Sequence, residues 1–207
     1  MRIVTARELE SWLASGKVLE KDARGPKVVA LENGLFLKIF HTRRQPWLAR
    51  LRPAATRFAC NAERLRLAGV PVPEVLEQLW LNRQTGLSAC LYRPLPGQSI
   101  EQLYLQAPQH AEQLLPSLAS FIYQLHRSGI YFRSLHLGNI LLLPDGGHGL
   151  IDILDLQCKR RPLSPWLVQR NFRHLKHYLS RRKLTDFPID SLIAHYQLCA
   201  GRRVRRD

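Results

Sequence analysis

The chain has 207 residues, of which 45% are hydrophobic and 23% are charged, an ordinary composition for a globular protein with one substantial core or two small lobes. No run approaches the roughly 18 to 20 apolar residues that a membrane-spanning helix needs. The first apolar segment contains Glu8, Glu10 and Lys17, which argues against a secretory signal. We therefore expect a cytoplasmic protein.

The formal net charge of +15 comes from 31 Lys and Arg against 16 Asp and Glu. The basic residues gather after position 158, in the groups 159–161, 170–176, 181–183 and 202–206. Such a surplus favours polyanionic partners: nucleic acid, anionic lipid headgroups or phosphorylated sugars. The alternative is a solvated basic face that only aids solubility. Charge alone does not choose among these polyanions.

The cysteine pattern excludes the common zinc and redox motifs. Four cysteines are widely scattered and form no C-x-x-C pair: Cys60, Cys90, Cys158 and Cys199. We expect reduced thiols that lie mostly in the core, the usual environment of free cysteine.

The first 93 residues alternate between helical and strand patterns. Thr5, followed three residues later by Glu8, predicts a short helix that begins near Ala6. Asn33-Gly34 predicts a tight turn between two strands at residues 27–31 and 35–40. Further along, we expect a helix over 53–68, ended by Gly69, and strands at 75–81 and 88–92.

Lys38 is unusual because it is embedded in an apolar strand. Alternation along that strand places Leu35, Leu37 and Ile39 on one face and Phe36, Lys38 and Phe40 on the other.

The irregular segment Pro94 to Gly97 is the best candidate for a boundary between a smaller lobe, residues 1–93, and a more helical lobe, residues 94–207. In the second lobe the spacing of apolar residues predicts helices over 99–106, 110–128, 166–182 and 190–198. A hairpin is expected between them, at 140–143 and 149–153.

The most informative motif lies at residues 131–142, Y-F-R-S-L-H-L-G-N-I-L-L, followed by L-I-D at 150–152. A kinase catalytic loop reads H-R-D-x-x-x-x-N, and a metal-binding Asp follows on the next hairpin. Here Asn139 stands five residues after Ser134, and Asp152 stands thirteen after Asn139. Serine thus occupies the position of the catalytic aspartate.

These segments resemble the lipopolysaccharide kinase family of the protein-kinase-like superfamily, which includes the Kdo and heptose kinases and the InaA and toluene-tolerance proteins, the last being the nearest in pattern. The resemblance covers roughly residues 20–180 and is firmest at F-R-S-L-H-L-G-N-I-L-L and L-I-D. It implies an α+β, two-lobed fold with a small antiparallel sheet in the N-terminal lobe and a shortened, mostly helical C-terminal lobe.

The resemblance also implies a site for ATP and Mg²⁺. Asn139 offers a neutral oxygen and Asp152 a carboxylate, which are hard ligands suited to Mg²⁺. Lys38 would contact the nucleotide phosphates, and Glu63 on the following helix would pair with it; the weaker alternatives for this acid are Glu8 and Glu101. The structural alternative is that Asn139 caps the loop and Asp152 ends a strand.

The chain departs from the kinase pattern in two ways. The first strand turn has only Gly25, so a glycine-rich phosphate loop is missing, although Arg24 and Lys27 lie nearby. The hydroxyl of Ser134 cannot accept a proton as a carboxylate does, and losing a positioned base typically costs about 10²–10⁴-fold in rate.

Two nearby residues are alternatives for the missing base, His136 and Asp155. His136 has the alternative role of holding the loop together. Asp155 has the alternative role of holding the backbone or of pairing with a basic neighbour such as Arg133.

Three functions follow from these patterns. The first is ATP-dependent phosphorylation of a saccharide or lipid-linked glycan, on an inner-membrane surface to which the basic C-terminal third would bind. The second is a pseudokinase that binds nucleotide or a partner and regulates envelope assembly or solvent tolerance. Specific nucleic-acid binding is the least favoured, because no known motif accompanies the basic clusters.

Overall fold

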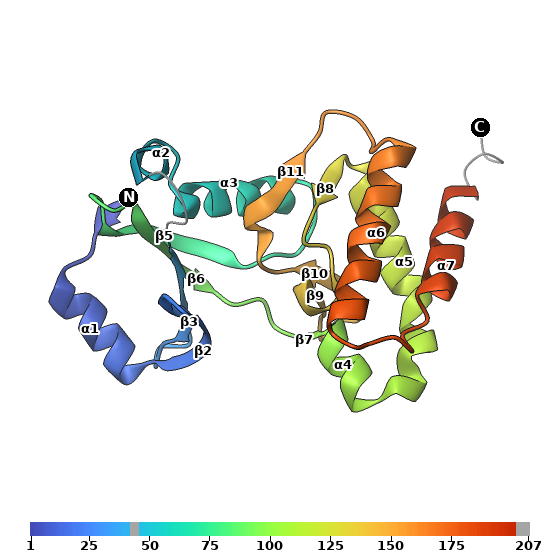
Figure 1. Ribbon diagram of the computed structural model, residues 1–207, viewed down its shortest axis with the longest axis horizontal. Helices are drawn as coiled ribbons and strands as arrows, with labels where there is room; N and C mark the ends of the chain where they lie inside the picture. The colour runs from blue at the N-terminus through green and yellow to red at the C-terminus, as the bar shows by residue number, and fades with distance from the viewer. Residues whose placement is uncertain (42–45, 202–207) are drawn as a thin grey trace. The chain divides into compact units, whose positions relative to one another are not determined.

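The structure is a computed structural model that describes residues 1–41 and 46–201, and the chain divides within it into two compact units (Figure 1). Unit 1 comprises Met1–Leu67 and Val72–Leu95, and unit 2 comprises Ala68–Pro71 and Pro96–Asp207. The arginines expected to form the basic tail, at 202–206, lie outside the described residues.

Unit 1 is built on a six-stranded sheet in the order β1-β5-β6-β4-β3-β2. All pairings are antiparallel except that of β1 with β5. The strands are β1 (Arg2–Ile3), β2 (Lys17–Asp22), β3 (Gly25–Ala30), β4 (Phe36–Phe40), β5 (Glu74–Asn82) and β6 (Leu87–Arg93). The predicted hairpin at Asn33-Gly34 is confirmed: Gly34 has a φ of 77°, and the side chain of Asn33 accepts the N–H of Leu35 at 3.1 Å.

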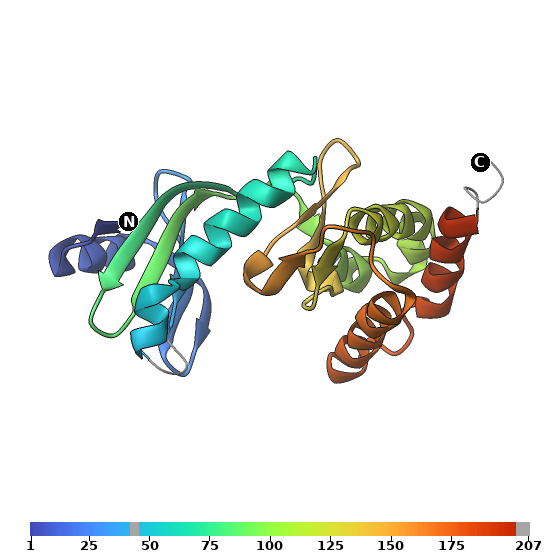
Figure 2. The ribbon, with the colours of Figure 1, turned by 90° about the horizontal axis from the view of Figure 1, so that it is seen from above.

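Helices pack on both faces of this sheet. Helix α1 (Ala6–Ser15) begins where Thr5 predicts it, with the Thr5 hydroxyl accepting the N–H of Glu8 at 3.2 Å. One face of the sheet contributes Leu37 and Ile39 to a core covered by side chains of α1. The opposite face meets α3 (Ala54–Leu67), which lies along the strands in Figure 2 and is preceded by α2 (Pro46–Leu51).

The aromatic side chains on the α3 face confirm the predicted alternation of β4. The ring of Phe58 on α3 lies 5.6 Å from that of Phe40 and 6.2 Å from that of Tyr92. Phe36 and Tyr92 contact edge to face at 5.8 Å. Lys38, between Phe36 and Phe40, therefore faces α3 rather than the α1 core.

Unit 2 is mainly helical, as expected, with two small antiparallel sheets. Its helices are α4 (Ile100–Gln106), α5 (Ala111–Arg127), α6 (Pro165–Arg181) and α7 (Ile189–Gly201), with short 3-10 turns η1 (Pro108–His110), η2 (Leu137–Asn139) and η3 (Ile153–Asp155). One sheet has the order β10-β9-β7, made of β10 (His148–Leu150), β9 (Ile140–Leu142) and β7 (Gln98–Ser99). The other pairs β8 (Ile130–Phe132) with β11 (Leu156–Cys158).

A buried polar group joins three helices of unit 2 behind the loop after β8. Asn171 on α6 is fully buried, and its Nδ2 donates to the carbonyl of Phe132 at 2.7 Å. The ring of His126 on α5 lies 3.0 Å from Asn171 Oδ1 and 3.0 Å from the hydroxyl of Tyr196 on α7. These bonds fix the end of β8, where the candidate site begins.

The expectation that most cysteines lie in the core is wrong. All four are free thiols, but only Cys90 is buried; Cys60 and Cys158 are exposed and Cys199 is intermediate. Cys60 lies on α3 between residues that face the sheet, so its own side chain points outward.

Among residues 1–41 and 46–201, no helix is both long and apolar enough to cross a bilayer.

Candidate active site

The predicted catalytic loop connects β8 to β9 and is held by its own backbone. The N–H of Leu135 donates to the carbonyl of Phe132 at 3.0 Å, and that of Asn139 donates to His136 at 2.9 Å. The N–H of Ile151, just after β10, donates to the carbonyl of Asn139 at 3.0 Å. This last bond ties the loop to the segment that carries Asp152.

Asn139 is buried, and both of its amide hydrogens are used inside the loop. Nδ2 donates to the carbonyl of Ser134 at 3.1 Å and lies 3.1 Å from Nε2 of His136. An amide nitrogen has two donors and no acceptor, so these two bonds fix the orientation of the carboxamide. Oδ1 is left on the other side as an acceptor, which suits a metal ligand.

His136 is held as a neutral ring. Because Asn139 Nδ2 can only donate, Nε2 of His136 accepts and its proton lies on Nδ1. Burial lowers the pKa of His136, against the opposing charges of Asp152, Glu101 and Asp155, so the ring is uncharged at neutral pH. With its Nε2 lone pair engaged, His136 orients Asn139, which is the alternative role expected of it, and its use as a base stays a prediction.

A second layer of side chains supports this ring. Tyr178 on α6 stacks on His136 with centroids 4.1 Å apart, and its hydroxyl donates to Glu101 Oε2 at 2.7 Å. Arg182 donates to the other Glu101 oxygen at 2.7 Å. A Cβ at Gly138 would come within 2.9 Å of the Glu101 carboxylate and 3.0 Å of the Tyr178 hydroxyl, so only glycine fits there without a shift.

Ser134 and Asp155 are brought together. The Ser134 hydroxyl donates to Asp155 Oδ2 at 2.6 Å, and Nε of Arg133 lies 3.7 Å from the same oxygen. The other oxygen, Oδ1, is buried and has no hydrogen-bond partner among the described residues. A carboxylate thus lies beside the hydroxyl that replaces the usual catalytic aspartate.

Asp152 ends the β9–β10 hairpin in a left-handed conformation, with φ 52° and ψ 44°. Such a backbone is uncommon for a residue other than glycine, although aspartate tolerates it, and residues of this kind gather at functional sites. Its side chain is exposed, and its charge acts on His136. Carboxylate and amide oxygens are ligands that Mg²⁺ prefers, and Asp152 and Asn139 stay the predicted metal ligands.

In unit 1, Lys38 is buried, and its Nζ lies 5.9 Å from the centre of the Phe58 ring. Its cross-strand neighbours are Cys90 on β6 and Val28 on β3. Burial raises the pKa of the Cys90 thiol to about 12, against the opposing charge of Lys38. A lysine at this depth is uncommon unless it is paired or functional.

A comparison with protein families shows which family the chain belongs to. Residues 32–196, well over half of the chain, match the family described as "Lipopolysaccharide kinase (Kdo/WaaP) family". The chain belongs to the lipopolysaccharide kinase family.

Solved structures give the same fold. Crystal structures of WbdD, one described as a bifunctional kinase-methyltransferase, superpose with TM-scores of 0.50 and 0.51 at 18% and 19% identity and cover 84% of this chain. This chain spans 43% and 42% of those two chains. The protein-kinase-like α+β fold expected from the sequence is confirmed, and no curated protein matches the chain.

The predicted site residues of this lipopolysaccharide kinase family member differ in how the structure holds them. It brings Ser134, His136, Asn139 and Asp155 into one bonded group in unit 2. It does not bring Glu63 to Lys38: both Glu63 oxygens accept from Arg66, at 2.7 and 2.9 Å, on the exposed side of α3. A pairing of Glu63 with Lys38 requires that surface contact to break, and it stays a prediction.

The remaining acidic and basic candidates have other contacts. Glu8 pairs with Arg2 at 2.9 Å, and Glu101 belongs to the Tyr178 network of unit 2. Lys27 on β3 pairs with Glu20 on β2, and in the turn between these strands the N–H of Arg24 donates to Asp22 at 2.8 Å.

Sequence patterns did not indicate the role of Tyr178 or the support that Glu101 gives it. Gly138, close to His136, could have indicated it, because a glycine at a loop turn often marks the close approach of another side chain.

Proposed function

We propose that the chain transfers the γ-phosphate of Mg-ATP to a hydroxyl of a saccharide or lipid-linked glycan of the cell envelope. The observation that carries the proposal is the carboxamide of Asn139, whose two N–H groups are both bonded within the loop so that Oδ1 is left to bind a cation. Membership of the lipopolysaccharide kinase family supports this use of the loop. Membership of this family also suggests the acceptor class, a saccharide or glycan.

Asn139 and Asp152 would hold Mg²⁺, and Lys38 would contact the nucleotide phosphates. A bound magnesium ion would neutralise the charge on the phosphates that react. Two oxygen ligands fit this task, because protein Mg²⁺ sites are commonly completed by water and substrate phosphate. Among the described residues, no group of three or more His, Cys, Asp or Glu side chains could hold a metal by itself.

Asp155 would act as the general base, a role that the hydroxyl of Ser134 cannot fill. Its carboxylate would accept the proton of the acceptor hydroxyl while the hydroxyl oxygen bonds to the γ-phosphorus, and the bond from that phosphorus to the leaving ADP oxygen would break. The unpartnered Oδ1 of Asp155 supports this role, since Oδ2 already accepts from Ser134. Ser134 would then orient the base rather than act as one.

The reaction would occur at the cytoplasmic surface of the inner membrane. The segment 159–183 contains nine Lys and Arg and no Asp or Glu, which would attract it to anionic headgroups at about 1 kcal/mol for each basic residue near the surface.

The test is transfer of labelled phosphate from Mg-ATP to purified core oligosaccharide and to lipopolysaccharide. Asp152→Asn and Asp155→Asn should each lower the rate by about 10²–10⁴-fold. Asp145→Asn, in the exposed turn of the same hairpin, is the matched control and should leave the rate unchanged. An absence of transfer to every acceptor, or transfer that Asp152→Asn leaves intact, would refute the proposed activity.

A second candidate is a pseudokinase that binds nucleotide or a partner and regulates envelope assembly. Ser134 and the single glycine of the first turn, Gly25, favour it. A rise in melting temperature with Mg-ATP but no transfer to any acceptor would support it, because a ligand that binds the native state raises apparent stability. Ser134→Asp that gains transfer would show that only the base had been lost.

A further inference from the structure

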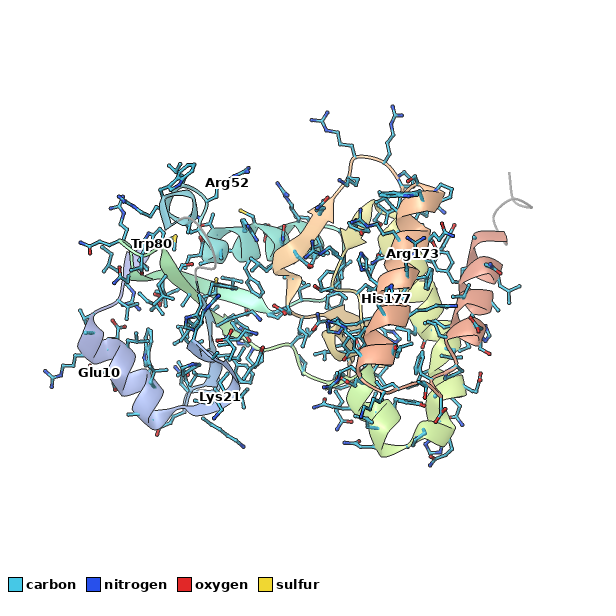
Figure 3. All side chains as sticks on the ribbon, viewed as in Figure 1. Glu10, Lys21, Arg52, Trp80, Arg173 and His177 are labelled. Carbon is cyan, nitrogen blue, oxygen red and sulfur yellow. The ribbon has the colours of Figure 1, made fainter. Side chains whose placement is uncertain are left out.

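Helix α6 carries a stripe of basic side chains on one face. Successive residues of an α-helix turn by about 100°, so Arg170, His174, His177 and Arg181 fall within about 60° of one another. We call these four residues the basic stripe. It extends over about 16 Å along the helix, at about 1.5 Å per residue. Figure 3 labels His177 of this stripe and Arg173 beside it.

The basic stripe runs beside the catalytic loop, because α6 is fixed to that loop at two points. Asn171 donates to the carbonyl of Phe132, the residue before Arg133, at 2.7 Å. Two turns on, Tyr178 stacks on His136 at 4.1 Å. Arg170 and His174 therefore lie near the start of the loop, and Arg181 lies near its centre.

Electrostatic effects agree with this placement. Burial lowers the pKa of His174, and the charges of Arg170, Arg133 and His177 lower it further, with only Asp155 opposing. The charge of Arg181 likewise acts on His136.

Three polar side chains near the start of the loop are candidates for binding a ligand. Nε2 of His174 is buried and has no hydrogen-bond partner among the described residues. The side chain of Arg133 is 65% exposed, and its one ion pair in the described part of the chain is the 3.7 Å contact of Nε with Asp155. Arg170 is held over the ring of Trp166 at 5.2 Å, with its guanidinium at the surface.

We propose that Arg133, Arg170 and His174 bind a phosphate group of the acceptor, next to the hydroxyl that Asp155 deprotonates. Two guanidinium groups present N–H donors in a fork that matches phosphate oxygens, and an imidazole is a third group that can donate. The two guanidinium charges exceed the one carboxylate charge of Asp155, which lies 3.7 Å from Arg133. The inference rests on the proposed function and names the acceptor class: a saccharide that already carries a phosphate.

The first test detects the phosphate site without requiring catalysis. The pKa of His174 is measured by NMR of its ring C–H groups, in inorganic phosphate and in chloride at equal ionic strength. Phosphate should raise this pKa in the wild-type chain, because an anion stabilises the charged ring. The rise should be lost in the double variant Arg133→Gln, Arg170→Gln.

The matched control is Lys176→Gln, which removes a positive charge from the same helix on another face, where Lys176 pairs with Asp190 at 2.9 Å. It should keep the wild-type response to phosphate. No rise in the wild type, or equal loss in the control and the double variant, would overturn the proposal even if the kinase activity is real.

The second test compares acceptors. With phosphorylated core oligosaccharide, Arg170→Gln should raise the KM for the acceptor roughly tenfold, as expected for one lost charge-assisted contact. The KM for ATP and the rate with dephosphorylated acceptor should not change. An equal KM for both acceptors in the wild type would refute the phosphate site while leaving the proposed transfer intact.

A third arm separates an acceptor phosphate from other anions. Glucose 6-phosphate, phosphatidylglycerol vesicles and a short RNA are each titrated into the wild type and the double variant, with glucose as the neutral control. Binding of glucose 6-phosphate that the double variant loses supports the proposal. Binding of vesicles or RNA alone through these residues would overturn it, because the site would then serve a surface or a polymer rather than a small acceptor.

Discussion

Asn139 in the catalytic loop and Glu63 on α3 lie in opposite surroundings. Asn139 is buried, and each of its amide hydrogens has an acceptor within the loop. Glu63 is exposed and bonded to Arg66, three residues along the same helix. Because a buried polar group must be paired, the surroundings of Asn139 determine its orientation, whereas an exposed ion pair is weak and can exchange partners.

The largest effect on stability should come from removing the buried amide. Asn139→Ala would leave the carbonyl of Ser134 and Nε2 of His136 without their donor, at about 1–3 kcal/mol for each group. We expect the free energy of unfolding, measured by urea denaturation, to fall by about 2–4 kcal/mol. A loss below about 1 kcal/mol would show that water replaces the amide at little cost.

The same contrast between buried and exposed groups applies to titration. Burial lowers the pKa of His126 to about 4, although its bond to Asn171 opposes the shift. The unfolded chain therefore binds a proton at higher pH than the folded chain does. The free energy of unfolding should therefore keep its full value above about pH 6.5. It should fall as the pH is lowered towards 4, by up to about 3 kcal/mol.

This pH dependence is measured by urea unfolding between pH 4 and 8. His126→Gln should flatten the decline, and the exposed His110→Gln should leave it unchanged. An equal slope in the wild type and in His126→Gln would assign the decline to other groups.

A smaller effect is expected at the close approach beside the loop. Gly138→Ala would place a methyl group 2.9 Å from the Glu101 carboxylate and 3.0 Å from the Tyr178 hydroxyl. We expect a loss of about 1–2 kcal/mol in the free energy of unfolding, because the packed neighbours must shift. The control is Gly201→Ala, which has open space around it and should leave the free energy of unfolding nearly unchanged. Gly146 is unsuitable as a control, because its φ of 82° would strain an alanine.

The smallest effect should be at Glu63. Glu63→Gln would weaken an exposed pair and should change the free energy of unfolding by less than about 0.5 kcal/mol. If the residue also pairs with Lys38 when nucleotide binds, the same variant should weaken the thermal shift produced by Mg-ATP. Arg66→Gln is the matched control, since it breaks the same surface pair but leaves the carboxylate.

The sequence predicted best where periodicity extended over several residues. The apolar spacing of α5 and α6, and the alternation of β4, each predicted an element and its inward face. The strands β1, β7, β8 and β11 have only two or three residues, too few for a pattern, and their pairing depends on distant partners.

The candidate site could be predicted in part for the same reason. The loop motif identified Asn139 and Asp152, because the spacing of residues within one loop and the next hairpin can be read directly from the sequence. The bond between Ser134 and Asp155 and the ring of Tyr178 on His136 join residues 21 and 42 positions apart, which only the fold brings together. Glu63 was chosen by its place on a helix, and spacing could not show that Arg66 competes for it.

The stacking of Arg170 on Trp166 has a practical consequence. Of the four tryptophans, Trp12, Trp47 and Trp80 belong to unit 1, and Trp166 alone belongs to unit 2. In a chain with phenylalanine at the first three positions, Trp166 would be the one indole that fluoresces. The guanidinium of Arg170 lies over this indole, and binding of the acceptor phosphate would move it away. Acceptor capture could then be followed optically, in real time and without a label.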